Sequence, residues 1–162
     1  MKQNRHINKV AVIGSGIMGS RIACHFANIG VEVLLLDIVP SDISDQDKQN
    51  KTSRNSIVND ALRNTLKSNP SPIYSKEFIN RITTGNLDDD LHKITDTDWI
   101  IEVVVEKLEI KKQVFEKIEK YRKAGTLISS NTSGIPIESM LEGRSKEFKK
   151  HFCGTHFFNP PR

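Results

Sequence analysis

The chain has 162 residues, of which 36% are hydrophobic and 27% charged, and its formal net charge is +4. This length and composition predict one globular domain of ordinary size and exclude a disordered chain. Apolar runs stay below the roughly 18 residues of a membrane span, and the N-terminus leads straight into a strand, which leaves no room for a signal peptide.

Charge and cysteine content narrow the class of protein further. Basic and acidic residues are mixed except over residues 146–150, so a nucleic-acid partner is not favoured. Cys24 and Cys153 form neither a disulfide framework nor a metal-binding spacing. We therefore expect a reduced, cytoplasmic protein that holds no metal.

The first predicted elements are a buried strand at residues 9–13 and a helix from 17 to 29, joined by the motif Gly14-x-Gly16-x-x-Gly19. Gly14 would make the tight turn, Gly16 would let a pyrophosphate approach the backbone, and Gly19 would let the helix lie close to the strand. The free N–H groups of the helix would then face the phosphates. This arrangement predicts a dinucleotide site.

A second strand at residues 32–37 ends in Asp37. Asp37 lies about 20 residues after Gly16, the spacing expected of the acid that binds the adenosine ribose. The alternative is a surface turn residue. No arginine directly follows Asp37 to compensate a 2′-phosphate, so NAD is preferred over NADP.

Residues 38–80 are predicted to form a helical insertion between the second and third strands. A polar loop containing Pro40 comes first, Ser53 could cap a helix that runs to about Lys67, and residues 69–72 would stop it. The insertion could contact substrate or a partner, or it could merely cover the edge of the sheet.

The remaining pattern alternates strands with helices. The strands are expected at residues 81–84, 99–105, 126–130 and 152–158, with a loop or short helix at 86–96, a helix ending at 124–125, a short helix opened by Pro136, and a connector at 148–151. Alternation of this kind predicts an α/β fold, a Rossmann-type doubly wound parallel sheet of order 3-2-1-4-5-6, within one domain at 1–162.

Asp37, Glu106, Ser133 and His156 all fall near the carboxyl ends of predicted strands, where ligands bind in such folds. A neutral imidazole at His156 can take a proton from an alcohol while hydride leaves the same carbon. The other four histidines are expected to have ordinary surface or core roles.

Four residues near these ends have two interpretations each. Ser133 and Asn131 could bind the reacting oxygen and the nicotinamide ribose, or form an ordinary turn. Glu106 could bind a cofactor hydroxyl or be a carboxylate stabilised at a helix start. Lys111 could reach the cofactor, although a solvated lysine is the commoner case.

These residues lie within motifs that resemble the NAD-binding domain of the 3-hydroxyacyl-CoA dehydrogenases of fatty-acid β-oxidation. The matching segments are residues 12–19, 101–106, 130–133 and 154–160, and the likeness covers essentially the whole chain. It implies NAD-dependent oxidation of an L-3-hydroxyacyl-CoA to the 3-ketoacyl-CoA, with His156 as catalytic base and Ser133 bound to substrate and cofactor. The expected cofactor-binding residues are Gly14, Ser15, Gly16, Ile17, Met18, Gly19, Asp37, Glu106, Lys111, Asn131, Ser133 and Asn159.

The resemblance also bears on what lies around this chain. Residues 83–90 and the long insertion look like the large bacterial members, which carry an enoyl-CoA hydratase region further along. In the family, a later carboxylate orients the histidine, and a C-terminal helical domain completes the substrate site and the homodimer. Both are missing before Arg162, so we expect a fragment that binds NAD but turns over poorly. Lys107 stands where many members have asparagine.

Two alternatives remain at this stage. One is another Rossmann dehydrogenase that acts on free β-hydroxy acids and uses a lysine base from a later helical domain. The other is a non-catalytic NAD-binding module.

Overall fold

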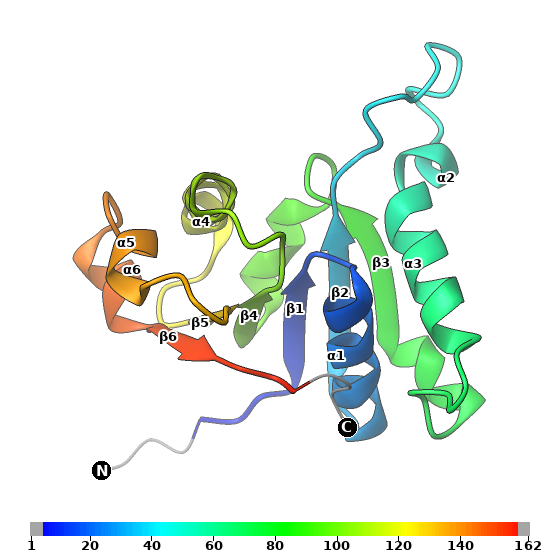
Figure 1. Ribbon diagram of the computed structural model, residues 1–162, viewed down its shortest axis with the longest axis horizontal. Helices are drawn as coiled ribbons and strands as arrows, with labels where there is room; N and C mark the ends of the chain where they lie inside the picture. The colour runs from blue at the N-terminus through cyan, green and yellow to red at the C-terminus, as the bar shows by residue number, and fades with distance from the viewer. Residues whose placement is uncertain (1–4, 159–162) are drawn as a thin grey trace.

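A parallel sheet of six strands runs through the computed structural model, which describes residues 5–158 (Figure 1). The strand order β3-β2-β1-β4-β5-β6 confirms the predicted topology. Strands β2 and β3 are added on one side of β1, and β4, β5 and β6 on the other. The order of the strands therefore changes direction between β1 and β4, and a ligand is expected to bind in the crevice at the carboxyl ends of these two strands. The strands are β1 (Lys9–Ile13), β2 (Glu32–Asp37), β3 (Ile82–Asn86), β4 (Trp99–Glu102), β5 (Leu127–Asn131) and β6 (Phe152–Thr155).

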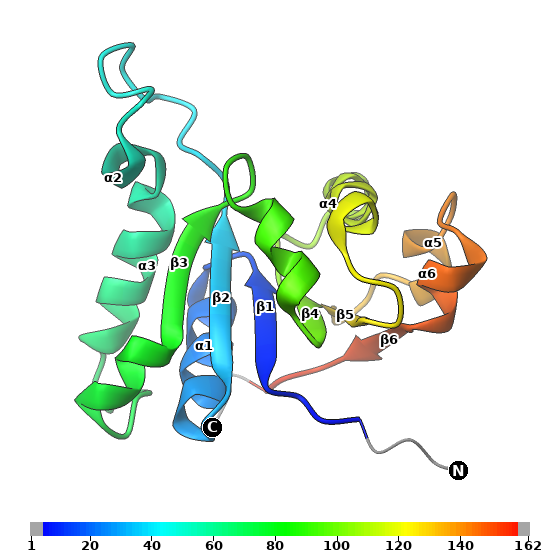
Figure 2. The same ribbon diagram turned by 180° about the vertical axis from the view of Figure 1, so that it is seen from behind.

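Helices cover both faces of this sheet (Figures 1 and 2). Alternate residues of β1 show why: Val10 and Val12 pack in one apolar cluster with α1 and α3, whereas Ala11 and Ile13 pack in a second with η2, α4, α5 and α6. Both faces are therefore buried, as a doubly wound fold requires. The helices are α1 (Ile17–Asn28), α2 (Lys51–Arg54), α3 (Ser56–Leu66), α4 (Leu108–Tyr121), α5 (Ile137–Met140) and α6 (Lys146–Lys150), and the 3₁₀ helices are η1 (Lys76–Arg81) and η2 (Leu91–Asp96).

Two predicted strands are shorter in the structure. β4 ends at Glu102, not at residue 105, because its partner β1 ends at Ile13 and the chain then turns away at Gly14. Residues 103–105 have the β-branched composition of a strand but lose the neighbour with which they would pair. β6 ends at Thr155, so His156 is the first residue beyond the strand.

Three local details of the prediction were also wrong. Asn50, not Ser53, caps the first helix of the insertion, because its side chain accepts the backbone N–H groups of Thr52 and Ser53. The Ser53 hydroxyl instead donates to Asp47. Asn55 divides the insertion helix into α2 and α3. The connector predicted at residues 148–151 lies mostly within α6, whose N-terminus is capped by the Ser145 hydroxyl. Within residues 5–158, none of the helices has the length and apolar character needed to cross a membrane.

Candidate functional site

The glycine turn after β1 is fixed by close backbone contacts. Gly14 has a φ of +102°, and a Cβ there would lie 2.7 Å from the carbonyl oxygen of Val103. A Cβ on Gly19 would lie 1.8 Å from the carbonyl oxygen of Gly14. The tight turn at Gly14 is confirmed, and the close approach at Gly19 is made mainly to the turn itself rather than to the strand.

Gly16 differs from the other two glycines because the space next to its Cα, where a side chain would lie, is open. Among the described residues, no heavy atom lies within 4 Å of a Cβ built on Gly16. Gly16 is the N-cap of α1, which has no side-chain cap among these residues and no acid in its first turn. The first N–H groups of a helix have no intrahelical acceptor. Open space beside free donors and a positive helix end fits the pyrophosphate of a dinucleotide.

Asp37 is attached directly to this turn. Its Oδ2 accepts hydrogen bonds from the backbone N–H and the hydroxyl of Ser15, both at 2.6 Å, and its Oδ1 accepts the N–H of Ile38 at 2.7 Å. A carboxylate has about four acceptor positions, so capacity remains for a ribose hydroxyl. Asp37 is thus bonded to the glycine turn, and its contact with the ribose stays a prediction.

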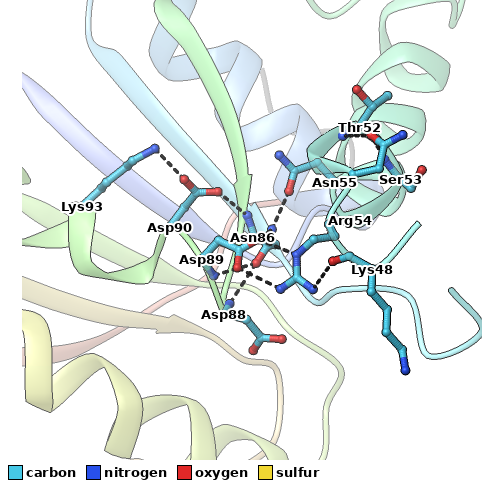
Figure 3. A network of polar contacts seen from close by, with 11 residues as sticks. Lys48, Thr52, Ser53, Arg54, Asn55, Asn86, Asp88, Asp89, Asp90 and Lys93 are labelled. Carbon is cyan, nitrogen blue, oxygen red and sulfur yellow. Dashed lines mark hydrogen bonds and ion pairs between the residues drawn. The ribbon is translucent and has the colours of Figure 1, made fainter. Parts of the chain in front are cut away.

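A polar network beside Asp37 holds the insertion against the end of β3 (Figure 3). Asn86 pairs with Asp37 in the sheet, and its side-chain amide donates to Asn55 at 2.6 Å and to Asp89 at 2.8 Å. Arg54 forms a two-pronged ion pair with Asp89, at 2.7 and 2.8 Å. The network holds Lys48, Arg54 and Asn55 of the insertion against the end of β3. Residues 86–96 were predicted as a loop or short helix; the structure has the 3₁₀ helix η2 there, and the network with the insertion was not predicted.

A buried ion pair lies at the end of β4. Glu102 and Lys111 are both inaccessible to solvent, and Lys111 Nζ is 2.8 and 2.9 Å from the two carboxylate oxygens of Glu102. The hydroxyl of Ser130 also donates to Glu102. Burial raises the pKa of Glu102, and the hydrogen bonds from Lys111 and Ser130 oppose that rise. Lys111 is therefore not a solvated lysine, and its expected contact with NAD stays a prediction.

Glu106 links the ion pair to the loop that follows β5. Its Oε2 lies 3.2 Å from Lys111 Nζ, and its Oε1 accepts the Thr132 hydroxyl and the N–H groups of Ser133 and Gly134. Partial burial acts to raise the pKa of Glu106, but the hydrogen bond from Thr132, followed by those from Lys111 and Ser133, lowers it to about 2. Glu106 is thus an anion that holds the residue 132–134 turn.

The imidazole of His156 rests on the same turn. Its Nδ1 is 3.1 Å from the carbonyl oxygen of Thr132. Asn131 fixes the chain just beyond, because its Oδ1 accepts the N–H of Phe157 at 2.8 Å. Ser133 and His156 both line a shallow, open pocket of about 440 Å³, which Ile137 and Gly154 also border. A hydroxyl, an imidazole and apolar side chains therefore face one hollow in the surface.

The structure brings most of the predicted site residues into one connected arrangement. Val103 touches the glycine turn, three residues before Glu106, and Glu106 reaches the loop that supports His156. Asn159 lies outside the described residues. Sequence reasoning missed Glu102 and Thr132, although a glutamate inside the apolar run of β4 was a signal that it needed a buried partner. Ile38 and Val105, which follow Asp37 and precede Glu106 in the chain, are 57% and 58% exposed.

Comparisons with known proteins show what the chain is similar to. Residues 9–162 match the family model described as 3-hydroxyacyl-CoA dehydrogenase, NAD binding domain. A probable 3-hydroxyacyl-CoA dehydrogenase of Bacillus subtilis is 51% identical, over 98% of this chain and 21% of its own length. A putative fatty acid oxidation complex trifunctional enzyme of Rickettsia felis is 47% identical, over 96% of this chain and 21% of its own.

A solved structure shares the fold as well. The crystal structure of (S)-3-hydroxybutyryl-CoA dehydrogenase from Ralstonia eutropha superposes with a TM-score of 0.68 at 26% identity, covering 96% of this chain and 51% of that one. The chain thus spans about a fifth of the two curated relatives and about half of the solved structure.

Proposed function

The chain belongs to the 3-hydroxyacyl-CoA dehydrogenase family and corresponds to the NAD-binding domain of that family. From this we propose that it takes part in the NAD-dependent oxidation of an L-3-hydroxyacyl-CoA to the 3-ketoacyl-CoA. NAD is the cofactor of this domain family. We assign the reaction to fatty-acid β-oxidation, with His156 as general base. The single observation that supports the base is the placement of its Nδ1 against the Thr132 carbonyl.

Cofactor binding is assigned to two groups of residues, one at the glycine turn after β1 and one at the loops that follow β4 and β5. The open face of Gly16 and the N–H groups of α1 would receive the pyrophosphate, and Asp37 would receive the adenosine ribose. Glu106 and Asn131 would lie toward the nicotinamide ribose. Ile17, Ile38 and Val105 offer exposed apolar surface for the ring systems.

Proton transfer is assigned to Nε2 of His156. A carbonyl oxygen can only accept a hydrogen bond, so the contact with Thr132 places the proton on Nδ1 and the lone pair on Nε2. Nε2 would take the proton of the substrate 3-hydroxyl. The chemistry that NAD would supply when bound is an acceptor for the hydride that leaves the same carbon. The Ser133 hydroxyl would hold the reacting oxygen in the shared open pocket.

The substrate, the assembly and the location of the complete protein are proposed from its family. We place an acyl-CoA as substrate, a homodimer as the assembled form, and the cytoplasm as its location. Residues 1–162 would form one domain with the 38–80 insertion inside it. The extra length of the relatives would cover the acyl chain and complete the dimer.

The proposal is tested by two measurements, one on this chain and one on a fusion protein that contains it. Calorimetry should show that the chain binds NAD and binds NADP more weakly. A fusion of this chain to the segment of the Bacillus subtilis relative beyond the match should reduce NAD with L-3-hydroxybutyryl-CoA and not with free 3-hydroxybutyrate. Turnover of the free acid alone would favour the β-hydroxy-acid alternative. Binding of NAD by a fusion with no turnover of either substrate would favour the non-catalytic module.

A further inference from the structure

Ser20, near the start of α1, is bonded to the glycine turn through both its side chain and its backbone. It is fully buried. Its hydroxyl donates to the carbonyl oxygen of Ser15 at 2.6 Å, and its backbone N–H donates to the carbonyl oxygen of Gly16 at 3.0 Å. One residue of the helix therefore bonds two successive carbonyl groups of the turn.

The hydroxyl bond reaches outside the helix. A serine within a helix commonly donates to the carbonyl three or four residues earlier. Ser20 instead donates to Ser15, which lies before α1 begins. In the part of the chain that the structure describes, no backbone N–H group donates to the Ser15 carbonyl. Because Ser15 is itself buried, the Ser20 hydroxyl supplies the hydrogen bond that this carbonyl needs.

The direction of the Ser15 carbonyl also sets the direction of the next N–H group. In a trans peptide unit, the C=O of one residue and the N–H of the next lie in one plane and point in opposite directions. With its carbonyl bonded to Ser20, Ser15 leaves the N–H of Gly16 pointing away from Ser20. Rotation of this peptide unit would exchange the two groups and put a carbonyl oxygen where the N–H had been.

Asp37 holds the peptide unit on the other side of Ser15. The backbone N–H of Ser15 donates to Asp37 Oδ2 at 2.6 Å. The Gly14–Ser15 peptide therefore depends on Asp37, and the Ser15–Gly16 peptide depends on Ser20. Since the two bonds act on different peptide units, experiments can separate their effects on ligand binding.

We propose that Ser20 is a positioning residue for the cofactor: its hydroxyl holds the Ser15–Gly16 peptide so that the Gly16 N–H, and not the Ser15 carbonyl, faces the pyrophosphate. The inference rests on the proposed function, which places the pyrophosphate at the open face of Gly16. An anion is attracted by N–H groups and repelled by a carbonyl oxygen. Ser20 acts from a buried position and would touch no atom of the cofactor.

The substitution Ser20→Ala removes the hydroxyl and suits a helix, because alanine has the highest helix propensity. Calorimetry of this chain with NAD and NMR titration with adenosine measure binding with and without the pyrophosphate. NAD affinity should fall roughly fivefold, the equivalent of one neutral hydrogen bond. Adenosine affinity should stay at the wild-type value, because the ribose is assigned to Asp37, which keeps both of its bonds to Ser15.

Thr97→Val is the matched control. The Thr97 hydroxyl also donates to a backbone carbonyl from a buried position, to Ile94 at 2.8 Å. Thr97 precedes β4 and lies at the other end of the sheet from the glycine turn. This variant should bind NAD and adenosine as the wild-type chain does, which separates positioning of the turn from a general loss of stability.

Two results would overturn the inference: a folded Ser20→Ala chain with wild-type affinity for NAD, or an equal loss of NAD and adenosine binding. If Ser20→Ala does not fold, Ser20→Cys replaces it, since a thiol is a weaker donor than a hydroxyl. Ser20→Cys should lower NAD affinity by a smaller factor, and an unchanged affinity would contradict the inference. A wild-type chain that binds NAD no more tightly than adenosine would instead contradict the pyrophosphate placement in the proposed function, so the two failures are distinguishable.

Discussion

Asp37 accepts two hydrogen bonds from Ser15, one from its backbone N–H and one from its hydroxyl, each 2.6 Å long. Ser15 lies inside the glycine turn, between Gly14 and Gly16. The acid expected to bind the ribose and the turn expected to bind the pyrophosphate therefore form one rigid unit.

This relationship predicts a large effect of Asp37→Ala on cofactor binding. The variant loses the ribose acceptor and the anchor of Ser15, so NAD affinity should fall about tenfold or more, as the loss of a charged hydrogen bond implies. The preference for NAD over NADP should fall with it. Calorimetry with both nucleotides measures this. Asp42→Ala, in the exposed loop nearby, is the matched control, and a preference that stays intact in Asp37→Ala would contradict the assignment.

Gly16 and Gly19 should respond in opposite ways to alanine. Gly16→Ala meets no atom within 4 Å among the described residues, so the free energy of unfolding should change by less than about 0.5 kcal/mol while NAD binding weakens. Gly19→Ala places its Cβ 1.8 Å from a carbonyl oxygen and should cost about 3 kcal/mol or more. Urea unfolding and calorimetry separate the two effects. A Gly16→Ala chain that binds NAD normally would argue against a pyrophosphate at this turn.

Glu106 should make stability depend on acid. Its pKa is lowered from 4.5 to about 2 in the folded chain, so its stabilisation is complete above pH 4.5 and is lost as the pH falls toward 2. Because the side chain is 43% exposed, solvent screening reduces the effect to about 1 kcal/mol.

The comparison of Glu106→Gln with the wild-type chain tests this. The loss of unfolding free energy between about pH 7 and about pH 3 should be smaller in the variant by about 0.6 kcal/mol, because part of the effect is lost only below about pH 3. Glu109→Gln controls for the removal of one carboxylate from the same part of the chain. An equal loss in Glu106→Gln and the wild type would show that the anchor does not contribute.

Lys111→Met should be strongly destabilising, because it leaves Glu102 buried without its cation. Removing one partner of a buried pair typically costs about 3–5 kcal/mol. Replacing both partners, as in Lys111→Met with Glu102→Leu, should recover part of that loss. Urea unfolding of the single and double variants measures the coupling between the two residues. Additive effects would mean that the pair is not coupled.

Sequence patterns predicted the sheet and its order because buried parallel strands are apolar runs with clear ends. Particular residues show where such reasoning stops. Residues 103–105 are β-branched, yet whether they join the sheet depends on where β1 ends. Lysine is usually a surface residue, and only the fold shows that Glu102 and Ser130 lie around Lys111.

Some residues of the candidate site could be predicted from the sequence, and others could not. His156, Ser133 and Glu106 could be placed near one another because parallel strands bring their carboxyl ends to one edge. Thr132 contributes through its hydroxyl and its carbonyl, and neither role leaves a mark in the sequence. The Asn86 network joins segments that lie more than one element apart, so it too required the structure (Figure 3).

The most direct test of His156 as the base is the substitution His156→Gln in the fusion enzyme described above, compared with His92→Gln on an exposed part of η2. Steady-state kinetics with NAD and L-3-hydroxybutyryl-CoA, together with calorimetry of NAD binding, separates chemistry from binding. The account predicts that His156→Gln lowers kcat by about a hundredfold to ten-thousandfold, the usual contribution of a general base, while NAD affinity and the His92→Gln enzyme stay near wild type. A His156→Gln enzyme with the wild-type kcat would contradict it.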